Sequence, residues 1–198
     1  MCWLSGYPCF SLLVPRARRI ANSRCACLSV PAATHRMPRV SNEAIAREVP
    51  EAFVGAGTLR SSNDAAAAAR EGARFAVSPG YTPALGSACR DAGLPLLPGV
   101  ATASEIMAAQ ADGFDALKFF PALQSGGSAM LKAWQGPFGD VLFCPTGGIQ
   151  PGNAAEFLAL ANVAYVGGSW LVSGDALAQG DWERITALPR AASQLARG

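Results

Sequence analysis

Lys118 is the side chain in this sequence best placed to do chemistry, because it lies inside the apolar run 116–121. Burial disfavours the charged ammonium group, lowers its pKa and leaves part of the population as a neutral, nucleophilic amine. Such an amine can condense with a carbonyl compound to form a Schiff base. The alternative is a lysine at a strand end whose head group reaches water, and the run alone does not separate the two interpretations.

Two glycine pairs, Gly147-Gly148 and Gly167-Gly168, follow the last two apolar runs of the chain. Glycine pairs at helix starts expose backbone N–H groups and can cradle an anion. Each pair by itself is better explained as a tight turn. Because the pairs follow neighbouring predicted strands, where β/α barrels commonly bind phosphate, we predict that together they form one anion site.

From about residue 42 onward, short apolar runs alternate with Ala-rich stretches and recur every 21 to 24 residues. This spacing fits repeated strand–loop–helix–loop units and a parallel sheet. The predicted strands are 52–54, 75–77, 95–97, 116–119, 141–143 and 163–166. The steady spacing favours a closed barrel, although an open doubly wound sheet would also place its site at the carboxyl ends of the strands.

Helix start signals separate these runs. Thr102 and Glu105 have the spacing of a capping box. Residues 62–64 are predicted to open an earlier helix and residues 152–153 a later one, and residues 182–197 are predicted to form the closing helix.

The composition predicts a single globular domain. Of the 198 residues, 51% are hydrophobic and 15% are charged, and no apolar stretch is long enough to span a membrane.

Residues 1–42 carry six arginines and no acid, so the remainder carries 10 basic against 14 acidic residues, a net charge of −4. A mildly acidic body argues against nucleic acid as a partner. The sparse cysteines of this body, Cys89 and Cys144, predict a reduced, cytoplasmic protein.

The first 41 residues differ from the rest of the chain. They hold four of the six cysteines and the only histidine, His35. The spacing of Cys25 and Cys27 does not suit a zinc knuckle or a redox pair. Because the sequence has a single histidine, a catalytic histidine dyad and a histidine-rich metal site are excluded. We therefore predict no metal.

The motifs taken together resemble those of the 2-keto-3-deoxy-6-phosphogluconate (KDPG) and 4-hydroxy-2-oxoglutarate (KHG) aldolase family. The resemblance covers about residues 44–190, in order and with matching spacing. The segments that carry it are Gly55-Ala56-Gly57-Thr58, Ser78-Pro79-Gly80, Lys118-Phe119-Phe120-Pro121-Ala122, Cys144-Pro145-Thr146-Gly147-Gly148 and Gly167-Gly168-Ser169-Trp170-Leu171.

This resemblance implies an α/β fold, the (β/α)8 TIM barrel, usually assembled as a homotrimer and working without a metal or organic cofactor. It implies a class I aldolase that acts on a small phosphorylated 2-keto acid, with no nucleic-acid or membrane partner. KDPG would be cleaved to pyruvate and glyceraldehyde 3-phosphate, and KHG to pyruvate and glyoxylate. The threonine of the Pro-Thr-Gly-Gly turn favours the gluconate over the galactonate series.

The resemblance also assigns roles to residues. Lys118 would be the catalytic Schiff-base lysine, and Thr58 would contact the carboxylate that becomes part of pyruvate. Pro79 and Phe120 would form an apolar wall that helps to depress the lysine pKa. Thr146 would lie beside the sugar-acid portion of the substrate. The expected phosphate-binding residues are Gly147, Gly148, Gly168 and Ser169.

One family feature has no counterpart in this sequence. The family supplies a general acid/base glutamate and a substrate-binding arginine from an early strand, and counting back from Lys118 places these positions near Val30 and Thr34. The first acid of the chain is Glu43, in a predicted outer helix, 42–48. Loss of a general acid/base typically lowers the rate about 100- to 10,000-fold, so we expect weak turnover.

We therefore divide the chain into an aberrant or poorly ordered segment, 1–41, and a β/α barrel aldolase domain, 42–198. Six units are visible where a full barrel has eight, so the barrel is predicted to be incomplete or aberrant in its first one or two units. Three explanations of residues 1–41 stay open: a targeting peptide, a degenerate or truncated homologue, or a frame-shifted start.

Two alternative functions compete with an active aldolase. A catalytically impaired pseudoenzyme would account for the missing glutamate. A phosphate-binding barrel isomerase or synthase would share the glycine turns, but it would not need Lys118 and would show carboxylates at its strand ends.

Overall fold

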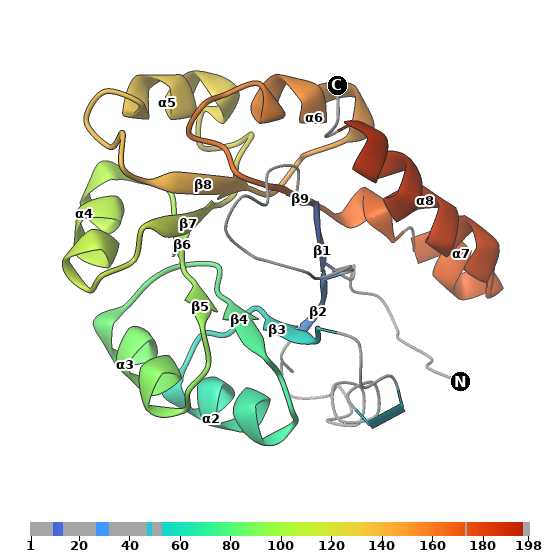
Figure 1. The fold of residues 1–198 in the computed structure, drawn as a ribbon, viewed down its shortest axis with the longest axis horizontal. Coiled ribbons are helices and arrows are strands. Elements are labelled where there is room, and N and C mark those ends of the chain that lie inside the picture. The colour runs from blue at the N-terminus through green and yellow to red at the C-terminus, as the bar shows by residue number, and fades with distance from the viewer. Residues whose placement is uncertain (1–9, 14–26, 32–46, 49–52, 173, 196–198) are drawn as a thin grey trace.

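The computed structural model describes residues 10–13, 27–31, 47–48, 53–172 and 174–195. Strands and helices alternate through most of this part of the chain (Figure 1). The strands are β1 (Phe10–Leu13), β2 (Cys27–Pro31), β3 (Gly55–Gly57), β4 (Phe75–Val77), β5 (Leu96–Leu97), β6 (Gly99–Val100), β7 (Ala116–Phe119), β8 (Leu142–Pro145) and β9 (Val166–Gly168). The helices are α2 (Ser62–Arg70), α3 (Pro83–Asp91), α4 (Ala103–Ala111), α5 (Gly127–Trp134), α6 (Pro151–Leu158), the 3-10 helix η1 (Ser169–Leu171), α7 (Gly174–Gln179) and α8 (Trp182–Leu195).

The strands form two sheets, with orders β5-β4-β3-β2-β1-β9 and β6-β7-β8. The two sheets meet at two places. Only Pro98 separates β5 from β6, and isolated parallel bridges join Phe143 to Val163 and Thr146 to Gly167. Figure 1 shows helices α2 to α6 on the outside of the strands. The fold is therefore α/β, with parallel sheets covered by helices.

Local side-chain bonds fix where the helices begin. In α4, the Thr102 hydroxyl accepts a bond from the Glu105 N–H at 3.3 Å, and the Glu105 carboxylate accepts one from the Thr102 N–H at 2.9 Å. This is the predicted capping box, and it is confirmed. Ser61 and Asp64 form a second box at α2. Each box places a helix start directly after the carboxyl end of a strand.

Three strands end later than predicted. The structure places β3 at Gly55–Gly57 rather than 52–54, β8 at Leu142–Pro145 rather than 141–143, and β9 at Val166–Gly168 rather than 163–166. Glycines that were expected to form turns therefore lie in strands. At Gly55 the reason is close packing, because a Cβ there would lie 2.1 Å from Cζ of Phe75. A larger residue would not fit between the two strands.

Residues 1–41 were expected to be aberrant or poorly ordered, but they supply two strands. Both β1 and β2 form there, from the short runs FSLL and CLSVP. β2 pairs in parallel with β3, whereas β1 runs antiparallel to both β2 and β9. This reversal is a departure from an all-parallel barrel. Four- and five-residue strands carry too little periodicity to stand out in a Cys-, Arg- and Ser-rich segment. The rest of the segment lies outside the described residues, and the division at residue 41 stays a prediction.

The larger core lies around β7 and β8. Trp134 of α5 packs its ring 5.1 Å from the Phe119 ring and 5.4 Å from the Phe143 ring. A second cluster of small residues, including Ala56, Ala65 and Ala76, lies between β3, β4 and the helices that cover them. Among the described residues, no helix combines the length and apolarity needed to cross a bilayer.

Candidate active site

Lys118 is buried in the third position of β7, with 5% of its surface exposed. Burial lowers the pKa of its amine from 10.5 to about 8, while the nearby Cys144 thiol acts weakly in the opposite direction. With a pKa near 8, about one molecule in ten carries the neutral amine at pH 7. The Nζ atom lies 4.4 Å from the centre of the Phe120 ring, so this ring lies beside the amine.

The backbone of three strands holds this lysine. Lys118 is paired with Gly99 of β6 on one side and with Cys144 of β8 on the other. Its N–H donates to the Pro98 carbonyl at 2.8 Å. A Cβ at Gly99 would lie 2.3 Å from the Pro79 carbonyl oxygen, so glycine at this position lets the Pro79 turn approach the strand beside the lysine.

Thr146 lies directly after β8 and is almost completely buried. Its hydroxyl donates to the Cys144 carbonyl at 3.4 Å. Its N–H donates to the Phe119 carbonyl at 2.9 Å, and its own carbonyl accepts the Ala122 N–H at 2.7 Å. The segment that follows Lys118 and the segment that follows β8 are thus bonded to each other at the carboxyl edge of the sheet.

The two glycine pairs are neighbours but differ in conformation. Gly147 and Gly148 have φ angles of 96° and 79°, which favour glycine strongly. Gly168 is extended, with φ −149°, and ends β9. The bridge between Thr146 and Gly167 holds the two pairs side by side. Ser169 follows, exposed, as the first residue of η1.

Two predicted site residues lie on other strands of the same edge. Thr58 follows β3 and is exposed, with φ 63°, a strained value for a β-branched residue. The Leu59 N–H that follows it donates to the Val77 carbonyl at 3.1 Å, which ties this turn to β4. Pro79 follows β4. The structure therefore gathers Lys118, Phe120, Thr146 and the glycine pairs closely, and places Thr58 and Pro79 at the same edge but on β3 and β4.

Among the strand residues that the structure describes near this edge, none supplies the expected acid. Val30, at the predicted position of the glutamate, lies in β2 and pairs with Ala56. Asp64 and Glu105 lie at helix starts on this edge, but each carboxylate accepts two backbone N–H bonds of its own cap. Both carboxylates cap helices, and we find no general acid/base for the site among the described residues.

Two residues near the site were missed as participants. Cys144 was given no role in the site, but it is the strand partner of Lys118. Burial raises the pKa of its thiol to about 12, so it stays protonated and neutral beside the amine. Leu123 is 44% exposed and packs against Gly148. In the sequence, only its position three residues after Phe120 indicated that Leu123 lies near the site.

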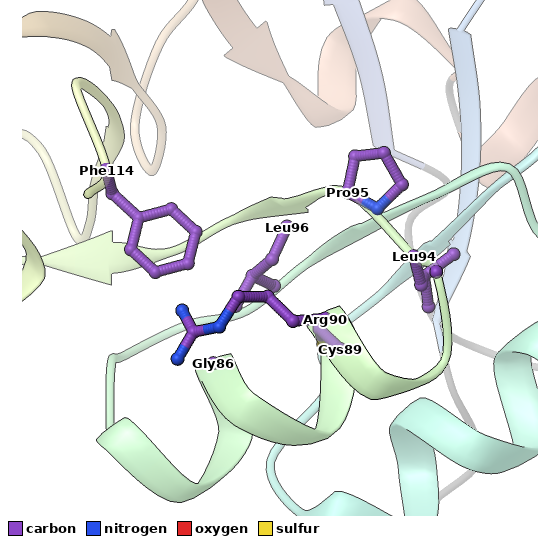
Figure 2. Close-up of a pocket in the computed structure, with 8 residues that line it drawn as sticks. Gly86, Cys89, Arg90, Leu94, Pro95, Leu96 and Phe114 are labelled. Atoms are coloured by element: carbon purple, nitrogen blue, oxygen red, sulfur yellow. The ribbon is translucent and has the colours of Figure 1, made fainter. Parts of the chain in front are cut away.

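A separate cavity of about 200 Å³ lies elsewhere, between α3 and the segments that lead into β5 and β7 (Figure 2). Pro95 directly precedes β5, and Phe114 closely precedes β7. The cavity is therefore at the amino ends of the strands, whereas the Lys118 site is at their carboxyl ends.

A parallel α/β fold with a buried amine at the carboxyl ends of its strands, next to glycine-rich turns, is the arrangement that a Schiff-base lyase requires. The family model for KDPG and KHG aldolase matches residues 18–188, and the chain belongs to this family. The match begins well before residue 44, where the recognisable motifs start.

Characterised relatives agree with this placement. The chain is 50% identical over 154 residues to the KHG/KDPG aldolase of Escherichia coli K12, covering 78% of this chain and 72% of the relative. It is 40% identical over 185 residues to the 2-dehydro-3-deoxy-phosphogluconate aldolase of Treponema pallidum, covering 92% and 86%.

Solved structures are similar as well. The KDPG aldolase of Legionella pneumophila, with pyruvate captured at low pH as a covalent carbinolamine, superposes with a TM-score of 0.79 at 42% identity, covering 83% of this chain and 80% of that one. The KDPG aldolase of Zymomonas mobilis with 3-phosphoglycerate superposes with a TM-score of 0.76 at 40% identity, covering 87% and 80%.

Proposed function

We propose that this chain is a class I aldolase that cleaves KDPG to pyruvate and glyceraldehyde 3-phosphate, and KHG to pyruvate and glyoxylate, through a Schiff base on Lys118. The observation that carries the proposal is the buried amine of Lys118, with a pKa of about 8, on a strand whose carboxyl end adjoins the glycine pairs. Family membership and relatives named as aldolases support it.

The chemistry begins with attack of the neutral Nζ on the C2 ketone. The resulting carbinolamine loses water and becomes a protonated imine. When the C4 hydroxyl gives up its proton, the C3–C4 bond breaks and its electron pair moves into the imine, leaving an enamine. The aldehyde product departs, the enamine is protonated at C3, and hydrolysis of the new imine releases pyruvate and regenerates Lys118. The protonated imine is the electron sink of this sequence.

The remaining groups bind and orient the substrate. Thr58 contacts the carboxylate, and Pro79 and Phe120 keep water from the imine. Thr146 lies beside the sugar-acid carbons. The phosphate is held by backbone N–H groups and one hydroxyl, supplied by Gly147, Gly148, Gly168 and Ser169. Positive φ at Gly147 and Gly148 supports this role, because left-handed backbone turns form anion-binding concavities.

We further propose that the strands close into a (β/α)8 barrel in a cytoplasmic homotrimer. The strand pairings that run from β5 through β1 to β9 support closure, with β1 and β2 in place of the first units. The buried thiols of Cys89 and Cys144 suit a reducing compartment. Light scattering on the purified protein tests the trimer directly. A pseudoenzyme has no support from the relatives, which are named as aldolases.

The decisive experiment is trapping. The protein is incubated with pyruvate and borohydride, digested, and its peptides are analysed by mass spectrometry. We expect reductive alkylation at Lys118 and none at Lys132, the only other lysine, which is exposed on α5. An unmodified Lys118, or equal labelling of the two lysines, would defeat the aldolase assignment. Lys118→Arg is the matched negative control.

A further inference from the structure

Leu123 and Trp170 pack against glycines of the proposed phosphate site. A Cβ at Gly148 would lie 2.5 Å from Cδ1 of Leu123 and 2.7 Å from its Cγ. A Cβ at Gly168 would lie 2.4 Å from Nε1 of Trp170 and 2.5 Å from its Cδ1. In both cases a neighbouring apolar side chain fills the space that the glycine leaves open.

Leu123 is tied to the turn that it covers. Its N–H donates to the Gly147 carbonyl at 3.2 Å, and the preceding Ala122 N–H donates to the Thr146 carbonyl. The residue is nevertheless 44% exposed, one of four large exposed hydrophobic residues in the described part of the chain. Leu123 does not belong to either buried core cluster, so its contact with Gly148 is not a by-product of core packing.

Trp170, which lies in η1, packs against the second glycine, Gly168. Its ring packs against the main core, and its Nε1–Cδ1 edge faces the Cα of Gly168. The buried Nε1 has no hydrogen-bond partner. A buried donor without a partner destabilises the fold, so the contribution of this tryptophan comes from the contacts of its ring, with the core and with Gly168.

Glycine segments are the most flexible part of a chain, whereas phosphate binding by backbone N–H groups requires them to be held in one arrangement. We propose that Leu123 and Trp170 are positioning residues that supply this rigidity and thereby set the selectivity for phosphorylated over unphosphorylated 2-keto acids. The inference rests on the proposed function, because it concerns the phosphate subsite of that reaction.

The test compares kcat/KM for KDPG, which carries a phosphate, with kcat/KM for KHG, which does not. For Leu123→Ala and Trp170→Ala we expect the KDPG-to-KHG ratio to fall about 10-fold, mainly through a higher KM for KDPG. Trp170→Phe retains a ring edge against Gly168 and removes the unpartnered N–H, so it should keep the selectivity of the unaltered protein. Met107→Ala, at an exposed apolar side chain on α4, is the matched control and should leave the ratio unchanged.

A second measurement does not depend on turnover. Binding of inorganic phosphate, followed by ³¹P line broadening, should weaken about 10-fold in Leu123→Ala and in Trp170→Ala. If neither substrate is cleaved by the unaltered protein, the proposed function fails, while phosphate binding still decides the inference. Equal loss of activity on both substrates, or phosphate binding unchanged in Leu123→Ala, whose exposed site makes misfolding a poor explanation, overturns it.

Discussion

The amine of Lys118 connects the packing of this protein with its proposed chemistry. It lies on a strand between two others, and the same desolvation that disfavours its charge provides the nucleophile. A lysine at this position serves reactivity at the expense of stability. Two predictions follow from that conflict.

The rate of pyruvate trapping at Lys118 should depend on pH through the lysine itself. Only the neutral amine attacks, so the initial rate should rise about tenfold per pH unit below 8 and level off above the pKa of about 8. The measurement is the single-turnover rate of borohydride-trapped adduct between about pH 6 and 10. A plateau reached only above pH 10 would mean that the amine is hydrated like an ordinary lysine.

Lys118→Met should make the protein more stable. The folded-state pKa of about 8 lies below the unfolded value of 10.5, so the unfolded chain binds more protons between these values. The stability of the unaltered protein therefore rises with pH across this window, and the full penalty is present below it. At pH 7 the methionine variant should gain roughly 1–3 kcal/mol in the free energy of unfolding. Urea titrations at pH 7 and about pH 10.5 measure this gain, which should shrink at the higher pH. The exposed Lys132→Met should show no such change.

At the scale of elements, the local structure of the proposed phosphate site depends on the segments after β8 and β9 more than on the helices. The Gly147-Gly148 turn is hydrogen-bonded to the segment after β7 and lies beside Gly167 of β9. The carboxyl ends of β7, β8 and β9 are therefore linked to one another. Backbone geometry at these glycines therefore controls the local structure.

Gly148→Ala should destabilise the protein, whereas Gly152→Ala should not. Gly148 has φ 79° and would place its new Cβ 2.5 Å from Leu123, so the loss should be about 1–3 kcal/mol. Gly152 lies in the first turn of α6 with nothing within 4 Å of a new Cβ, and alanine there should stabilise by up to ~1 kcal/mol. Thermal unfolding of the two variants checks the contrast. Similar effects in both would show that the left-handed turn is not required.

At the scale of the whole molecule, the unusual part is the pair of strands β1 and β2, which lies between β3 and β9. β1 runs against its neighbours, and the sequence offers no acid before Glu43. The register of β2 then determines at which position a carboxylate could supply the missing general acid/base. Pro31 pairs with Gly57, next to Thr58, while Val30 pairs with Ala56 of the Ala-rich cluster under the helices. Successive strand residues alternate between the two faces, so these positions serve opposite sides of the sheet.

Turnover of KDPG should therefore be weak and should respond to an added acid. Pro31→Glu is expected to raise kcat at least 10-fold, within the about 100- to 10,000-fold range of general acid/base catalysis, and Val30→Glu is expected to leave it unchanged. Steady-state assays coupled to pyruvate release make the comparison, with circular dichroism to confirm that each variant is folded. A larger gain in Val30→Glu would show that β2 is shifted by one residue from the register described above.

The sequence alone was sufficient for the residues whose chemistry is local. The apolar run around Lys118, the Thr102–Glu105 cap and the Gly147-Gly148 turn can be recognised from residues close in sequence. The burial of Lys118 was decided by the tertiary structure, because it depends on the neighbouring strands β6 and β8. The tertiary structure alone decided which strands are neighbours. It paired Lys118 with Cys144, set Leu123 and Trp170 against the two glycines, and formed strands β1 and β2 within a segment that was predicted to be aberrant or poorly ordered. Those features depend on contacts between distant parts of the chain, which no local pattern encodes.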